Sequence, residues 1–265
     1  MHKLSRQIRF SVNPFLDETP TGDNSYSSKP CGEGLALFFA LWVELQATVD
    51  PDTGFVVNVV EIDKLIRKSV IGVFTDFVTD RFRKAKHTSL PDISALLEQT
   101  WPVINNQFGN AKLTKLGLQL NPSRKISIEI GNQTMTYFSE KFEFAAMHKL
   151  WNKSFTDEKN FQVFGKCANP SGHGHNYVIE VTIEKQNLDD TFKIGTFGKL
   201  VSKEFIDLVD HKNLNVDVPE FAETIPTVEN IAVFAWDILS QKINFARLSN
   251  VTVWESDRTS CTYSG

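Results

Sequence analysis

The stretch from Phe164 to Tyr177 reads FGKCANPSGHGHNY, and it decides how the rest of the chain is interpreted. A loop rich in Asn, Pro, Ser and Gly leads into a predicted strand that starts at His173. Side chains alternate between the two faces of a strand, so His173 and His175 lie on one face. The apolar residues with the same parity are Tyr177, Ile179, Val181 and Ile183. Both imidazoles therefore point toward the apolar side, which favours a metal site.

A third histidine is available in the preceding predicted strand, whose sequence is KFEFAAMH. Its inward face carries Phe142, Phe144, Ala146 and His148. If the two strands pair, three imidazoles converge and leave one position of a tetrahedral zinc ion open, as in catalytic zinc sites. Imidazole suits zinc, although copper and iron accept the same ligands. The alternative is that His148 is an ordinary core histidine and that HGH is a turn.

Composition and charge set the class of protein. The 265 residues are 41% hydrophobic and 23% charged, which is typical of a soluble globular protein of one large domain or two smaller ones. The formal charge of −4 includes no basic block, so no nucleic-acid partner is expected. Three widely spaced cysteines, Cys31, Cys167 and Cys261, favour a reducing, cytoplasmic compartment.

No membrane association is expected either. The opening sequence MHKLSRQIRF does not resemble a signal peptide, and the longest apolar run, Leu35 to Val43, is too short to cross a bilayer.

The first half of the chain is predicted to contain four strands and two helices. A loop from Asn13 to Gly34 separates the first two strands, and the sequence DPDTG at 50–54 predicts a turn. The predicted strands cover 4–12, 35–50, 116–120 and 125–130, and the helices cover 55–74 and 90–104. The first helix has a stripe of Ile62, Leu65, Ile66, Ser69, Val70 and Val73.

The second half repeats this order. Strands are predicted at 135–150, 173–185, 248–257 and 258–265, and helices at 192–211 and 225–243. The buried side of the first helix is expected to hold Phe197, Leu200, Val201, Phe205 and Leu208. In the second helix, Thr227 is the expected N-cap, and the apolar stripe contains Val228, Ile231, Ala232, Ala235, Ile238 and Leu239.

The two halves can be aligned with each other. Pro91 and Trp101 match Pro226 and Trp236 at equal spacing, and the segments LNPSR and WESDR align Asn121 with Glu255. These matches indicate an internal duplication of a ββ-α-α-ββ unit, with a domain boundary between residues 131 and 132. Two unrelated α+β patterns are the alternative. The first half has no histidines at the matching positions, so we expect residues 1–131 to be a structural copy without metal.

The second half resembles the 6-pyruvoyl-tetrahydropterin synthase family. The residues that carry this resemblance are FEFAAMHKL, FGKCANPSGHGHNY, VDHKNLN, PTVENIAVFAW and VTVWES, which together cover nearly all of 138–265. Cys167 lies six residues before His173, a spacing similar to that of the pyruvoyl-forming enzymes. The related 6-carboxy-tetrahydropterin synthases of queuosine biosynthesis usually have a shorter gap.

The resemblance implies an α+β fold of two tandem tunnelling-fold units, each an antiparallel four-stranded sheet with two helices on one face. Such units assemble into barrels by pairing sheet edges. Three of these double chains would supply a six-unit assembly of the kind found in the family, so a homo-oligomer is expected.

The resemblance also implies a role for each site residue. His148, His173 and His175 match the zinc ligands, and Cys167 matches the catalytic cysteine. Asp210 and His211 match the pair that completes the catalytic set, and Glu255 matches the carboxylate that anchors the pterin ring. Thr227 and Glu229 lie in the segment that lines the pterin pocket.

The reaction implied by the resemblance converts 7,8-dihydroneopterin triphosphate to 6-pyruvoyl-tetrahydropterin with elimination of triphosphate. Its alternatives are the 6-carboxy-tetrahydropterin synthase reaction and a non-catalytic role in pterin binding or as a scaffold. Cys167 also has an alternative role as a fourth zinc ligand, which would close the metal site. Candidate cations for the triphosphate are Lys141, Lys149, Lys166 and Arg258.

Overall fold

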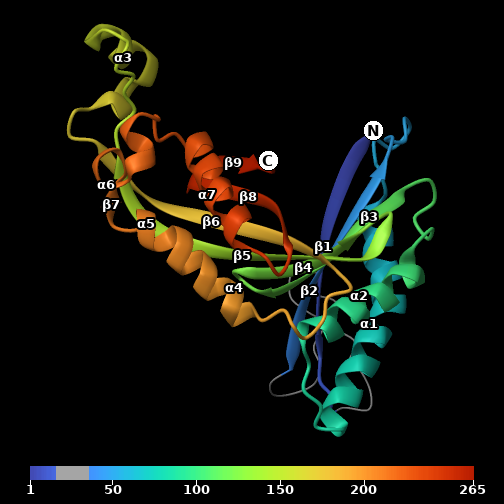
Figure 1. Cartoon of the computed structure of the whole chain (residues 1–265). Coiled ribbons are helices and arrows are strands. Elements are labelled where there is room, and N and C mark those ends of the chain that lie inside the picture. The colour runs from blue at the N-terminus through green and yellow to red at the C-terminus, as the bar shows by residue number, and fades with distance from the viewer. Residues whose placement is uncertain (16–35) are drawn as a thin grey trace. The chain divides into compact units, whose positions relative to one another are not determined.

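The structure is a computed structural model that describes residues 1–15 and 36–265 (Figure 1). Most of the predicted Asn13–Gly34 loop, together with Cys31, lies outside the described residues. The chain divides into two compact units, which are described separately. The first comprises Met1–Phe138 and Lys185–Thr191, and the second comprises Ser139–Glu184 and Phe192–Gly265. The division passes through a strand, whereas the predicted boundary lies at the preceding turn, where Gly131 has a φ of +94°.

The first unit contains an antiparallel sheet with two helices. Its strands are β1 (His2–Val12), β2 (Leu37–Ala47), β3 (Lys112–Asn121) and β4 (Arg124–Glu129), which pair in this order. The first residues of β5 (Asn132–His148) follow β4. The helices are α1 (Val59–Arg83) and α2 (Leu90–Ile104). The predicted turn at 50–54 is present, with Gly54 at a φ of +72°.

The core of the first unit lies between one face of the sheet and α1 and α2. Ile8, Phe10 and Val12 alternate along β1 and are buried, as the two-residue period of a strand requires. Phe10 meets Phe74 of α1 edge to face, with ring centroids 5.2 Å apart. Half of the predicted stripe of α1 is buried (Ile62, Ile66 and Val70), whereas Leu65, Ser69 and Val73 are only half-buried. The buried side also holds Ile71, Phe74 and Val78, the last of them beyond the predicted end at residue 74.

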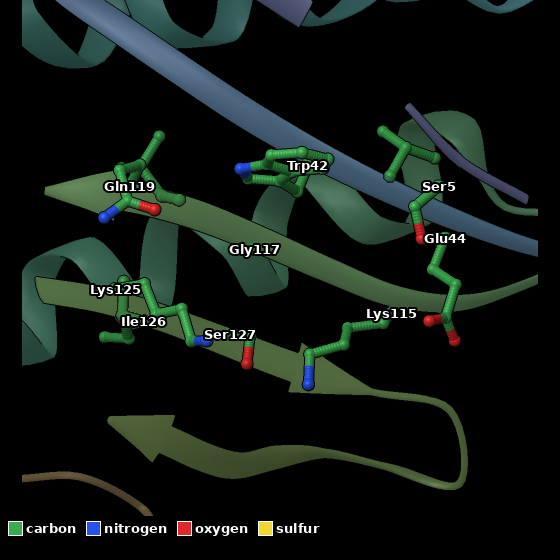
Figure 2. A pocket seen from close by; sticks show the side chains of 11 residues that line it. Ser5, Trp42, Glu44, Lys115, Gly117, Gln119, Lys125, Ile126 and Ser127 are labelled. Atoms are coloured by element: carbon green, nitrogen blue, oxygen red, sulfur yellow. The ribbon is translucent and has the colours of Figure 1, made fainter. Parts of the chain in front are cut away.

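The opposite face of this sheet carries a shallow hollow of about 320 Å³ (Figure 2). Trp42 lies over Gly117, because these two residues are direct partners in the β2–β3 register. Polar side chains from four strands surround the indole, which is 40% exposed. Phe38 and Trp42 of β2 point away from the core and are 58% and 40% exposed, so this strand carries large apolar side chains on both of its faces.

The second unit contains the remainder of β5, then α3 (Asp157–Phe164) and the 3₁₀ helix η1 (Gly165–Ala168). Next come β6 (His173–Gln186), α4 (Ile194–Val201), the π-helical segment η2 (Ser202–Ile206) and α5 (Asp207–Val209). A two-residue strand β7 (Lys212–Asn213), α6 (Leu214–Asp217) and the 3₁₀ helix η3 (Pro219–Ala222) follow. The unit ends with α7 (Val228–Lys242), β8 (Arg247–Ser256) and β9 (Thr259–Tyr263).

The sheet of the second unit has the order β5-β6-β8-β9, and β7 pairs with β5 in parallel. Once the short inserted elements are set aside, both units run strand, strand, helix, helix, strand, strand. Their origin by duplication and their assembly into a barrel stay predictions.

The predicted helix at 192–211 is wrong in one respect. Leu208 was expected on its buried side, but Leu208 is 45% exposed and Val209 is fully buried. The buried positions are Phe197, Val201, Phe205 and Val209, which are four residues apart. The π-helical segment η2 explains this spacing, because its hydrogen bonds span one residue more than those of an α-helix.

Candidate active site

The second unit brings its three predicted metal ligands together. His148 ends β5, whereas His173 and His175 begin β6, the neighbouring strand in the sheet. One ligand nitrogen from each of the three imidazoles lies within 4.8 Å of the others. Within residues 1–15 and 36–265, this is the only group of His, Cys, Asp or Glu side chains with the geometry of a metal site.

The hydrogen bonds of His148 orient its ring. Its Nδ1 lies 2.7 Å from the Pro226 carbonyl oxygen, which can only accept, so Nδ1 donates and Nε2 carries a lone pair. This Nε2 lies 3.1 Å from His173 Nε2. Metal-ligating histidines commonly donate their second ring N–H to a carbonyl in this way.

Hydrogen bonds among the three imidazoles cannot satisfy all of their ring nitrogens, whereas a bound cation could take one nitrogen from each ring. His173 has the capacity to donate a proton to His148 Nε2, yet His175 Nε2 would remain buried without a hydrogen-bond partner among the described residues. A single bound cation would give all three nitrogens a partner. Ligand nitrogens around tetrahedral zinc lie about 3.4 Å apart at ordinary Zn–N bond lengths. The Nε2 atoms of His148 and His173 are 3.1 Å apart, and all three ligand nitrogens lie within 4.8 Å of one another.

Burial favours the neutral form of two of these histidines, His148 and His173. Burial lowers the pKa of His148, and this effect outweighs the opposing hydrogen bond to Pro226. The pKa of His173 is lowered first by burial and then by the charge of His175. Neutral imidazole is the form that binds a metal, so the site does not have to release protons at neutral pH.

Tyr177 closes the inner side of the histidine group. It is fully buried on the same face of β6, it stacks on Phe144 with ring centroids 4.9 Å apart, and its ring meets His175 edge to face. Burial raises the pKa of its hydroxyl. The aromatic packing therefore limits how the imidazoles can turn.

Glu255 borders the histidine group from β8. One of its carboxylate oxygens lies 3.3 Å from His148 Nε2 and 3.5 Å from His175 Nε2. It is not a member of the ligand group itself. The carboxylate therefore faces the place where a cation, or a molecule held by that cation, would lie.

Cys167 lies in η1, in the loop that leads to β6. Its carbonyl oxygen accepts from the Leu150 backbone N–H at 2.9 Å, which ties the loop to the end of β5. Burial raises the pKa of its thiol, and the negative charge of Glu255 raises it further. The sulfur is not part of the ligand group, so the geometry gives no support to the alternative of a fourth metal ligand.

Asp210 and His211 form a close pair beside the same end of β5 that carries His148, because the His211 backbone N–H donates to the Ala145 carbonyl oxygen. His211 Nδ1 lies 2.9 Å from Asp210, whose other oxygen accepts from the Ala145 backbone N–H at 2.8 Å. The Ala145 hydrogen bond and then the His211 contact lower the pKa of Asp210. His211 has a φ of +55°, and its side chain is 81% exposed.

The histidine group and the Asp210–His211 pair border one open hollow of about 560 Å³. His175 and His211 both line it. No interaction found among the described residues joins the Asp210–His211 pair directly to Cys167.

Thr227 and Glu229 lie at the start of α7. Thr227 is the N-cap, as predicted, and its hydroxyl accepts from the Asn230 backbone N–H. Glu229 is an exposed acid in the first turn, where the helix dipole favours it. The sequence did not reveal two residues next to Thr227. Pro226 acts through its main-chain carbonyl, which leaves no mark in the residue types, and the Asn230 side chain binds a carbonyl of a turn that forms only in the fold.

The model of the 6-pyruvoyl tetrahydropterin synthase family matches residues 137–265. The 6-pyruvoyl tetrahydrobiopterin synthase of Homo sapiens is 37% identical to this chain, over 51% of this chain and 95% of the human protein. The chain belongs to the 6-pyruvoyl tetrahydropterin synthase family. The family match leaves the first 136 residues of this chain uncovered.

Two further comparisons concern the same half. The 6-carboxy-5,6,7,8-tetrahydropterin synthase of Aquifex aeolicus is 27% identical, over 47% of this chain and 95% of that protein. The structure of 6-pyruvoyl tetrahydropterin synthase from Caenorhabditis elegans is 33% identical over 49% of this chain and 96% of that chain, with a TM-score of 0.47. The relatives of the family named here are synthases, so the match supports an enzyme at the level of the family. Within the described residues, no helix is long and apolar enough to cross a membrane.

Proposed function

We propose that this chain is a zinc-dependent lyase that converts 7,8-dihydroneopterin triphosphate to 6-pyruvoyl-tetrahydropterin and releases triphosphate. The observation that carries the proposal is the group formed by His148, His173 and His175, with the Glu255 carboxylate at its edge. A 6-pyruvoyl tetrahydropterin synthase family match over the same residues supports it.

The three histidines would hold zinc and leave one position open for substrate. When bound, zinc supplies Lewis acidity to the oxygens of the substrate side chain. Glu255 would bind the pterin ring, because a carboxylate accepts two parallel N–H groups in the way that it accepts a guanidinium. Thr227 and Glu229 would line the pocket beside it.

Cys167 would act as the base that removes the carbon-bound proton of the side chain. Its pKa is raised by burial and by Glu255, so the thiol is protonated at neutral pH in the absence of metal. A nearby cation lowers the pKa of a thiol, and the base is therefore expected to form only in the metal-loaded protein.

His211 would transfer protons to and from the side-chain oxygens. The Asp210 carboxylate is ionised, lies 2.9 Å from Nδ1, and holds the ring so that Nε2 is free to exchange protons. The exposure of His211 leaves this nitrogen open to substrate.

The assembly and the compartment are part of the same proposal. Three chains would form the six-unit assembly, and a monomer in light scattering would contradict this. A cytoplasmic location agrees with the two described cysteines, Cys167 and Cys261, both of which are free thiols.

A product assay tests the function. Zinc-loaded protein would be incubated with 7,8-dihydroneopterin triphosphate, and the pterin product would be identified by mass spectrometry. A pyruvoyl product with released triphosphate is expected, and a Cys167→Ala variant should lose turnover yet keep zinc. A carboxy product with acetaldehyde would assign the chain to the queuosine branch. Zinc binding without turnover would favour a pterin-binding or scaffold protein.

A further inference from the structure

The acceptor that orients His148 belongs to a tight turn before α7. The Thr227 backbone N–H donates to the Ile225 carbonyl oxygen at 2.8 Å, which closes a three-residue γ-turn around Pro226. Proline holds its own φ near the value that such a turn needs. The turn uses the Ile225 carbonyl internally and leaves the Pro226 carbonyl for His148, at 2.7 Å from Nδ1.

Asn230 holds both ends of this turn. Its side-chain Nδ2 donates to the Ile225 carbonyl oxygen at 2.8 Å, and its backbone N–H donates to the Thr227 hydroxyl at 3.3 Å. Ile225 therefore receives two donors, one from the turn and one from the side chain. Without the Asn230 amide, the turn would depend on the single bond from Thr227.

We infer that Asn230 is a positioning residue for the metal site. It fixes the γ-turn, the turn aims the Pro226 carbonyl at His148 Nδ1, and this bond keeps His148 Nε2 facing the other two imidazoles. Groups that orient a ligand histidine tune metal affinity even though they do not touch the metal. This inference rests on the proposed function, because it takes the three histidines as a metal site.

The same turn also carries Thr227 and Glu229, the residues proposed to line the pterin pocket. Asn230 thus connects the metal side of the site to the pterin side through one short segment of main chain. A change that loosens the turn should weaken zinc binding and pterin binding together.

Zinc affinity, measured by chelator competition, tests this inference without any turnover. Asn230→Ala removes the side-chain donor, and Asn230→Asp removes it at almost constant size. Both variants should raise the Kd for zinc about threefold to tenfold, below the roughly 10–100-fold expected for loss of a direct outer partner. Cobalt substituted for zinc should show an altered visible absorption spectrum in both.

Asn160 offers a matched control in the same unit. It is fully buried, and its amide donates to backbone carbonyls of the preceding loop, including Asn152 at 3.0 Å and Thr156 at 3.1 Å. Asn160→Ala should lower the melting temperature yet leave the zinc Kd within twofold of the wild type, because no bond of Asn160 leads to His148.

The outcomes separate the two proposals. Unchanged zinc affinity and an unchanged cobalt spectrum in the Asn230 variants would overturn the positioning role while leaving the zinc site intact. An equal loss of affinity in Asn160→Ala would overturn it as well, because the effect would then be general destabilisation. A wild-type chain that binds no zinc would overturn both the inference and the proposed function.

Discussion

At the scale of single residues, the site places two histidines whose neutral form is favoured, His148 and His173, near a thiol whose protonated form is favoured. Burial lowers the pKa of His148 and raises that of Cys167, because a desolvated group avoids its charged form. The Glu255 carboxylate adds to the effect on Cys167 through its negative charge. Without a metal, these two imidazoles are therefore in the form that can bind a cation, and the thiol of Cys167 is protonated.

Replacing Glu255 tests the electrostatic part of this picture. Glu255→Gln removes the negative charge that disfavours the thiolate, so the pKa of Cys167 should fall. In metal-free protein, alkylation of Cys167 by iodoacetamide should then become faster at a fixed pH below the wild-type pKa. The pH dependence of the rate gives the pKa directly.

Cys31 and Cys261 would be changed to Ser in the reference protein and in each variant, so that the alkylation rate reports on Cys167 alone. Glu229→Gln serves as the control: its charge acts on Cys261 and is not among the causes of the Cys167 shift. A Glu255→Gln rate profile identical to that of the wild type would contradict the prediction.

At the scale of elements, the loop before β6 determines where the two histidines of that strand enter the site. Gly172 has a φ of +69°, in the left-handed region that favours glycine. A Cβ at this position would lie 2.9 Å from the His148 carbonyl oxygen and 3.1 Å from the Met147 side chain. The loop therefore packs directly against the end of β5.

Substitution of Gly172 should be costly for this reason. Gly172→Ala is expected to lower the free energy of unfolding by about 2–4 kcal/mol, from the left-handed conformation and from the contact with His148. Chemical denaturation measures the change. Gly172→Ala should also weaken zinc binding, because the backbone of His148 must shift to make room for the Cβ.

Gly54→Ala is the matched substitution. Gly54 has a φ of +72° with no atom within 4 Å of a Cβ, so it should cost only the conformational part, about 1–2 kcal/mol. If the two variants lose equal stability, the proposed packing of the loop against His148 is wrong.

The start of α2 supplies a second prediction at this scale. Ser89 and Asp92 form a capping box, and Arg81 of α1 also binds Asp92. Burial raises the pKa of Asp92, but the hydrogen bonds from Ser89 and the charge of Arg81 outweigh it, so the net pKa lies below the ordinary value of 3.8.

A carboxyl group with a lowered folded-state pKa stabilises the fold above its unfolded pKa, and this contribution disappears as the pH falls through the folded value. Asp92→Asn should therefore destabilise the protein by about 1 kcal/mol at pH 7. The difference from the wild type should shrink as the pH drops below 3.8, as measured by urea unfolding across the pH range. Asp52→Asn, at an exposed position, should have little effect at any pH.

At the scale of the whole molecule, the predicted site is confined to one of two compact units. All nine predicted site residues lie in the unit that comprises Ser139–Glu184 and Phe192–Gly265. Within the described part of the first unit, no group of side chains has the geometry of a metal site. The first unit nonetheless has a complete sheet, two helices and an aromatic core.

Zinc should therefore act on the second unit alone. Metal analysis should give about one zinc per chain, and zinc should slow amide hydrogen exchange around His148, at 173–177 and at 225–231. A ligand present at 100 times its Kd adds about 2.7 kcal/mol to the stability of the state that binds it. Exchange in Met1–Phe138 should be unchanged when EDTA removes the metal, and a second tight zinc would contradict this division.

Much of the fold and part of the site could be predicted from residue order alone. The parity of His148, His173 and His175 follows from the two-residue period of strands, and all three converge. The capped start of α7 at Thr227 is equally local. Leu208 was misplaced because a π-helical segment changes the period without changing the residue types.

Pro226 and Asn230 were missed for a different reason. The Pro226 carbonyl acts through the main chain, and the value of the Asn230 amide depends on a turn whose closure cannot be seen before the chain is folded.

Because His148 is oriented by a main-chain acceptor, mutation affects this part of the site unevenly during evolution. Every codon at position 226 encodes a carbonyl oxygen, so no single substitution there deletes the acceptor atom itself. Codons at position 230 have no such protection, because only the side chain supplies the second donor to Ile225. In a saturation library ranked by zinc affinity, position 226 should accept more residues than position 230, and the losses at 226 should reflect only the backbone angle that proline fixes. The orientation of His148 would then depend more on the residue type at position 230 than on the residue type at position 226, whose carbonyl contacts the ring.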